Sequence, residues 1–167
     1  MRPASEPGAA RHLAVFNIAT LIAPEGDPRV QAFFDGVDRL NAIAARSPGF
    51  VWQFHGDGQD AAMLDYDSTG LTIPQLSVWE TAQDLANFVW NTLHRQYFQR
   101  AKEWFEPLGD LPYLVFWWVA PGHIPNCAEG LDKLDQLRRD GPVLEIFGWE
   151  RFRTEGLIPG RQPVGAS

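Results

Sequence analysis

The segment PYLVFWWVA (residues 112–120) constrains the fold more than any other stretch of this chain. Its bulky apolar side chains occupy both alternating sets of positions, so a strand formed here would present apolar groups to both sides of a sheet. Such a strand is stable only when both of its faces are covered. We therefore expect a strand over 112–120 and cover for both faces of the sheet that contains it.

The remaining hydrophobic patterns predict a chain that alternates between strands and helices. Further strands are predicted where apolar and β-branched residues alternate or run together, at 12–22, 50–55 and 73–80. Helices are predicted where apolar residues recur at helical spacing, at 27–47, 85–105 and 127–141. The polar, glycine-containing run 56–72 is predicted to be a long loop, and 145–152 a last strand or an extended segment.

This order, β-α-β-loop-β-α-β followed by a helix, is that of a split β-α-β arrangement and predicts a ferredoxin-like α+β fold. In that fold the sheet is antiparallel and the helices lie on one face. Because 112–120 is apolar on both sides, we expect a partner subunit's sheet to cover the other face. The sequence therefore predicts a homodimer whose sheets pack face to face as a dimeric α/β barrel around a cavity.

Length and composition are those of one globular domain, with 45% hydrophobic residues in a chain of 167. Residues 12–152 are expected to form this domain, between flexible arms at 1–11 and 153–167 that are rich in proline, glycine and small residues. A net charge of −7 argues against nucleic-acid or membrane-surface partners. A single cysteine and the lack of a signal or membrane-spanning segment in the sequence predict a cytoplasmic protein.

Several catalytic motifs are missing from the sequence. It contains no phosphate-binding glycine loop, GxSxG, HExxH or CxxC pattern, which excludes nucleotide-dependent enzymes, elbow-type serine hydrolases and zinc enzymes of those kinds. The aspartates of 56–72 lack the ligand spacing of a calcium loop, so no metal is expected. Cys127 begins a helix, where a thiol can be activated, but a single buried cysteine is more often inert.

The predicted helix 85–105 carries more aromatic residues than a single buried stripe requires. At about 100° per residue, its apolar side chains divide between two faces. The first face is that of Leu85, Phe88, Val89 and Leu93, and the second is that of Trp90, His94, Tyr97 and Phe98. Either other protein covers the second face or this face lines a ligand cavity, and we adopt the cavity as the prediction to be tested.

Four separated blocks of the sequence carry a family resemblance. They are HLAVFNIATLIAP (12–24), SPGFVWQ (47–53), LSVWETAQDLANFVWNTLHRQYFQRAKEWFEP (76–107) and LVFWWVAPGHIPNCAEGLDKLDQLRRDGP (114–142). Together they resemble the DUF3291 family, which is itself similar to the antibiotic-biosynthesis-monooxygenase-like superfamily of dimeric α/β barrels. The resemblance implies a small apolar cavity between sheet and helices, often with a helix histidine near its mouth.

The superfamily implied by this resemblance contains several chemistries. They include cofactor-independent monooxygenases, haem-degrading enzymes, cyclases, isomerases and proteins without known chemistry. The haem-degrading branch has an asparagine where this chain has Asn17. At the positions of that branch's tryptophan and axial histidine, however, this chain has Phe88 and Phe98. This departure argues against haem degradation of that type and leaves another mode of haem binding open. No cofactor is expected, with haem as the alternative.

The candidate catalytic residues are His94, Tyr97 and Arg100. An imidazole titrates near neutral pH and can act as base or acid, so His94 is the predicted proton carrier. Tyr97 and Arg100, three and six residues further on, can orient it or stabilise a developing enolate or oxyanion. The competing interpretation is structural, with His94 bonded to a backbone carbonyl and Arg100 paired with Glu103.

The candidate substrate-binding residues are polar or aromatic side chains that can face the cavity, namely Asn17, Trp52, Trp90, Phe98 and Trp117. A buried amide such as Asn17 needs hydrogen-bonding partners, and a tryptophan can stack on a planar ligand. We therefore expect a homodimeric enzyme acting on a hydrophobic, aromatic or polyketide-like molecule, either as a cofactor-independent monooxygenase or as a cyclase or isomerase. The alternative is a non-catalytic barrel protein that binds a small ligand or haem.

Overall fold

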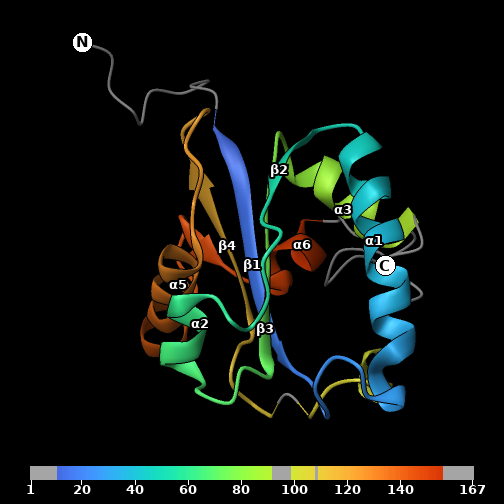
Figure 1. The fold of residues 1–167 in the computed structure, drawn as a ribbon. Helices are drawn as coiled ribbons and strands as arrows, with labels where there is room; N and C mark the ends of the chain where they lie inside the picture. The colour runs from blue at the N-terminus through green and yellow to red at the C-terminus, as the bar shows by residue number, and fades with distance from the viewer. Residues whose placement is uncertain (1–10, 92–98, 108, 156–167) are drawn as a thin grey trace.

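The computed structural model describes residues 11–91, 99–107 and 109–155 (Figure 1). The described elements, in chain order, are β1 (His12–Thr20), η1 (Pro28–Val30), α1 (Gln31–Arg46), β2 (Phe50–Gln53), α2 (Ala61–Tyr66), β3 (Thr72–Trp79), α3 (Ala82–Asn91), η2 (Ala101–Glu103), β4 (Leu114–Val119), α5 (Cys127–Asp140), β5 (Ile146–Phe147) and α6 (Trp149–Thr154). None of the described helices is long and apolar enough to cross a bilayer.

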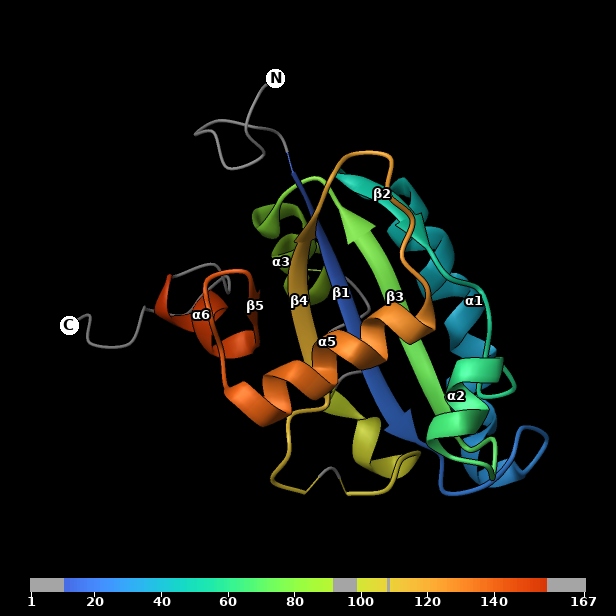
Figure 2. The same cartoon turned by 90° about the vertical axis from the view of Figure 1, so that its left-hand side faces the viewer.

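The strands form one five-stranded sheet in the order β2-β3-β1-β4-β5, seen face-on in Figure 2. Every described pairing in it is antiparallel. The predicted α+β fold with an antiparallel sheet is therefore confirmed. Strand β1 lies at its centre, between β3 and β4, because the two β-α-β units interleave, and this brings Asn17 of β1 directly opposite Gln75 of β3.

Helices lie on both faces of the sheet, so the prediction that they cover one face only is wrong. Helices α1 and α3 cover one face, and α2 and α5 cover the other (Figure 1). The first face packs Leu114 and Phe116 of β4 against α3 and α6. The second packs Val115 and Trp117 against α5. Both apolar faces of β4 are thus covered by helices of the same chain. A partner subunit's sheet is therefore not needed to cover the second face.

Helix α5 fits closely on the sheet because its sequence supplies both caps and a small residue at the contact. The side chain of Asn126 caps its start by accepting from Glu129 N, and Gly141 ends it with a φ of 77°. At Gly130 a Cβ atom would lie 2.5 Å from the ring of Phe16 in β1. Glycine is therefore needed here for the close approach of helix and strand.

The run 56–72, predicted as a loop, contains the short helix α2, so that prediction is wrong for its central part. Asp60 caps α2 by accepting from Ala62 N, and Met63 is fully buried in the core beneath α5. The carboxylate of Asp67 then accepts hydrogen bonds from Thr72 and Thr69, which lower its pKa. Six helical residues are too few for their periodicity to be read from the sequence.

The prediction of one helix over 85–105 is wrong at its far end. Helix α3 is described as far as Asn91, whereas Ala101–Glu103 is a 3-10 turn. The chain after this turn lies beside the end of β1, because Ile22 N donates to Trp104 O and Glu106 N donates to Thr20 O. Tertiary pairing with β1 thus replaces helical hydrogen bonding in this segment.

The segment 145–152, predicted as a strand or an extended segment, forms a two-residue strand and a helix. Strand β5 pairs with β4, and α6 follows directly. Phe152 of α6 is buried against Phe116, with ring centroids 4.5 Å apart. These aromatic contacts hold the C-terminal part of the domain on the α3 side of the sheet.

Candidate functional site

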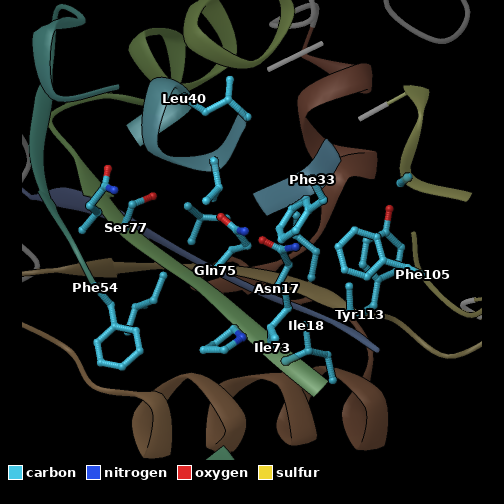
Figure 3. Close-up of a pocket in the computed structure, with 18 of the residues that line it drawn as sticks. Asn17, Ile18, Phe33, Leu40, Phe54, Ile73, Gln75, Ser77, Phe105 and Tyr113 are labelled. Atoms are coloured by element: carbon cyan, nitrogen blue, oxygen red, sulfur yellow. The ribbon is translucent and has the colours of Figure 1, made fainter. Parts of the chain in front are cut away.

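A cavity of about 960 Å³ lies between the sheet and helix α1 (Figure 3). Its sheet side is formed by β1 and β3, its helix side by α1, and its ends by α3, the segment 99–107, Tyr113 and Trp149. This volume is within the range of protein sites that enclose a small organic molecule. The cavity is therefore the candidate site.

Local periodicity explains which side chains face the cavity. On β1, alternation directs Val15, Asn17 and Ala19 to the side covered by α1. On α1, apolar residues at helical spacing, such as Phe33 and Leu40, face the sheet. Most of the wall is consequently apolar, and its polar groups are few.

Two carboxamides form the polar centre of the sheet side. Asn17 and Gln75 are directly opposite each other on β1 and β3. Figure 3 shows their side chains next to each other, in the space below Leu40 and Phe33. Cβ atoms of directly opposed residues lie about 4.5–5.5 Å apart. Within the described ranges neither carboxamide forms a hydrogen bond, whereas neighbouring Ser77 accepts one of 3.0 Å from Trp79 Nε1.

Two further hydrogen-bond donors belong to the aromatic wall. Tyr113 and Phe105 lie together at one end of the cavity (Figure 3). Burial raises the pKa of the Tyr113 phenol, which therefore stays protonated at neutral pH and can donate a hydrogen bond. The indole nitrogen of Trp149 is buried and has no hydrogen-bond partner among the described residues.

The charged side chains in the described part of the cavity lining are all exposed. They are Asp38, Asp57, Glu106, Lys102 and His55. Carboxylates outnumber ammonium groups by three to one in this set, and the described lining contains no arginine. The described border of the cavity thus carries more negative than positive charge.

Among the predicted site residues that the structure describes, Asn17 alone lines the cavity. His94, Tyr97 and Phe98 lie outside the described residues. Arg100 is exposed and forms an ion pair of 3.0 Å with Glu103, while its guanidinium lies 4.8 Å from the ring centre of Trp104. This ion pair is the one that the structural interpretation of Arg100 predicted from the sequence.

The predicted tryptophans lie elsewhere. Trp90 packs in the core beside Trp149, with ring centroids 6.2 Å apart. Trp117 lies on the α5 side, where its indole donates to Glu129 Oε2 at 2.9 Å. Trp52 also packs on that side, because an irregularity in β2 between Phe50 and Trp52 places these two residues on opposite faces.

Sequence reasoning missed Gln75, Tyr113 and Trp149. A signal for Gln75 was present, because it is a polar residue at an inward position of a predicted strand, as Asn17 is. Tyr113 and Trp149 fall within the predicted segments 112–120 and 145–152, but Tyr113 precedes β4 and Trp149 begins α6, so strand alternation did not give their direction. Their positions depend on how the segments before β4 and after β5 pack against the sheet.

Cys127 is not an activated thiol. It is buried, and burial together with the neighbouring carboxylate of Asp60 raises its pKa to about 12. A thiol with such a pKa carries almost no thiolate at neutral pH. Its role is to pack the first turn of α5 into the core.

The described residues offer little for a metal or a haem. Among them, no group of three histidine, cysteine or acidic side chains is placed to hold a metal ion. Asp57 and Asp60 instead cap local turns by accepting backbone hydrogen bonds. A haem brings two propionates, yet the described cavity lining provides one histidine, His55, and mainly negative charge. His94, the histidine through which haem was considered from the sequence, lies outside the described residues, and haem stays the alternative expectation.

Comparison with known families extends the resemblance found in the sequence. Residues 12–158 match the family described as a domain of unknown function, DUF3291. The chain belongs to the DUF3291 family. No curated protein matches this DUF3291 chain. Its predicted likeness to the antibiotic-biosynthesis-monooxygenase-like superfamily stays a prediction.

Two solved structures resemble the DUF3291 chain weakly. One is a protein of unknown function, NE2512 from Nitrosomonas europaea, with 12% identity, a TM-score of 0.46 and coverage of 71% of this chain and 99% of that one. The other is MupZ from Pseudomonas fluorescens, with 17% identity, a TM-score of 0.42 and coverage of 85% of each chain. These scores are too low for either protein to bear on the function of this one.

Proposed function

We propose that this DUF3291 protein binds a small, largely apolar molecule in the cavity between α1 and the sheet. The observation that carries the proposal is the cavity itself, with a volume of about 960 Å³, apolar walls and a few polar groups. Cavities that bind organic ligands have this composition, since apolar contacts provide affinity and a few hydrogen bonds provide orientation. Asn17 and Gln75 are the orienting groups nearest the middle of the sheet.

The same proposal includes chemistry on the bound molecule. The substrate expected is aromatic or polyketide-like, and the reaction is cofactor-independent oxidation by O₂ or a proton transfer that leads to cyclisation or isomerisation. Amide and phenol donors, here those of Asn17, Gln75 and Tyr113, can stabilise the enolate or phenolate oxygen that develops in such reactions. His94 as the proton carrier and the homodimer belong to this proposal as expectations from the sequence.

Binding in the cavity is tested with N-phenyl-1-naphthylamine, a neutral aromatic probe whose fluorescence rises in apolar surroundings. Wild type should bind it saturably. The double variant Ala19→Phe/Val37→Trp fills the cavity from the sheet and from α1, and should weaken binding by about tenfold or more, because the apolar contact area is lost. The measurement is a fluorescence titration, with circular dichroism to verify folding.

The matched control is Ala42→Trp, on the exposed side of α1 and outside the cavity lining. It should bind the probe as wild type does. Equal affinity of the double variant and wild type would contradict the proposed site, because the probe would then bind elsewhere on the surface.

Catalysis by O₂ is tested with anthrone, whose oxidation consumes one O₂ and yields anthraquinone and water. Wild type should accelerate O₂ uptake above the buffer rate, and the double cavity variant should lose most of this acceleration. His94→Ala tests the predicted proton carrier in the same assay and is expected to lower the rate at least about 10²-fold. Saturable probe binding with O₂ uptake at the buffer rate would favour a binding protein over the oxygenase.

A further inference from the structure

We infer that the cavity selects an uncharged, planar ligand with a carbonyl or hydroxyl oxygen, and that Asn17 and Gln75 bind this oxygen together. The inference rests on the proposed function and specifies the class of ligand. Three features of the described wall carry it, namely the pairing of the two amides, the charge around them and the aromatic rings.

The first feature is the pair of amides at the centre of the sheet. Asn17 and Gln75 are fixed in register by the β1–β3 pairing and face the same cavity. Each carboxamide offers two N–H donors and one acceptor, and within the described ranges neither is used in a protein hydrogen bond. Asn17 is half-buried and Gln75 is exposed, so a ligand that covers both displaces water from them and must supply partners, or it leaves the amides unsatisfied. An oxygen between the two side chains can accept from both.

The second feature is the sign of the charge. Asp38, Asp57 and Glu106 line the cavity, while Lys102 is the ammonium group in the described lining. A carboxylate or phosphate ligand would meet net repulsion, and no described guanidinium lines the cavity to pair with it. Neutral amides at the centre and carboxylates around them therefore favour an uncharged ligand over an anion.

The third feature is the aromatic lining between sheet and helix. Phe33 and Phe105 meet edge to face with centroids 5.1 Å apart, and Tyr113 lies beside Phe105 at the same end (Figure 3). Phe88 and Trp149 line the cavity as well. Such rings pack favourably against the faces and edges of a flat molecule. The ligand is thus a planar body with its oxygen directed at the sheet.

A series of naphthalenes with one shared ring system tests this inference. Naphthalene, 2-acetonaphthone and 2-naphthoate displace N-phenyl-1-naphthylamine, and their affinities follow from the displacement curves. The neutral ketone should bind about tenfold or more tightly than naphthalene, because naphthalene leaves the amides without a hydrogen-bond partner. It should also bind about tenfold or more tightly than the naphthoate anion, because the carboxylates around the cavity repel the anion. Gln75→Leu should bring the two affinities for the ketone and for naphthalene close together, because the ketone loses a hydrogen-bond donor and naphthalene no longer leaves that amide unsatisfied.

The control variant is Gln136→Leu on α5, across the sheet from the cavity, which should not change any of these affinities. If naphthalene or naphthoate binds wild type as tightly as the ketone, or if Gln75→Leu keeps the preference for the ketone, the inference is overturned while cavity binding stands. If neither the probe nor any naphthalene binds, the proposed function fails first.

Discussion

Replacement of Phe116 by alanine should lower the free energy of unfolding by about 3–5 kcal/mol, the usual loss for a large buried aromatic side chain. Phe116 is completely buried in β4. Its ring packs on Phe147, Trp149 and Phe152, with centroid separations of 5.7, 5.0 and 4.5 Å. The alanine variant removes the shared surface on which β5 and α6 pack, and the cavity that remains cannot close without moving several rings.

Urea unfolding followed by circular dichroism measures this loss. Val143→Ala is the control, since Val143 is 48% exposed and its replacement should change the free energy by less than about 0.5 kcal/mol. Because Trp149 packs on Phe116 and also lines the cavity, Phe116→Ala should weaken binding of the aromatic probe as well. A stability loss near that of the control would mean that β5 and α6 are not docked on β4 as described.

Gly130→Ala should destabilise the protein by about 1–3 kcal/mol, although alanine is the better helix former by about 1 kcal/mol. The added Cβ would lie 2.5 Å from the buried ring of Phe16, so α5 would have to move away from the sheet. The sign of the effect is therefore decided by packing against β1 and not by helix propensity. Thermal or urea unfolding provides the measurement.

Ala128→Gly is the matched control, because Ala128 is exposed in the same helix and should lose only the propensity difference of about 1 kcal/mol. Phe16→Leu in the Gly130→Ala background should recover part of the stability, since the two sites are in contact. Stabilisation by Gly130→Ala alone would contradict the docking of α5. The second face of the sheet would then be available to a partner subunit, as the sequence analysis expected.

Much of the fold could be predicted from local patterns. The apolar, partly β-branched runs at 12–22 and 73–80, with the alternation of side chains along a strand, and the helical spacing in 27–47 indicated the strands and the helix that form the two sides of the site. The inward position of Asn17 followed from the same alternation, and the structure places it in the cavity wall. These features depend on side-chain period, which is a property of neighbouring residues along the chain.

Tertiary structure decided the rest. Whether α5 or a partner covers the second face depends on the close approach at Gly130, which involves a strand more than a hundred residues earlier in the sequence. The side on which Trp52 lies depends on an irregularity in the β2–β3 pairing. The juxtaposition of Asn17 with Gln75 depends on the β1–β3 register. The sequence by itself thus determined the main strands, the helix over 27–47 and the inward position of Asn17, whereas long-range pairing and packing, which leave no local period, decided the remaining elements and which residues share a site.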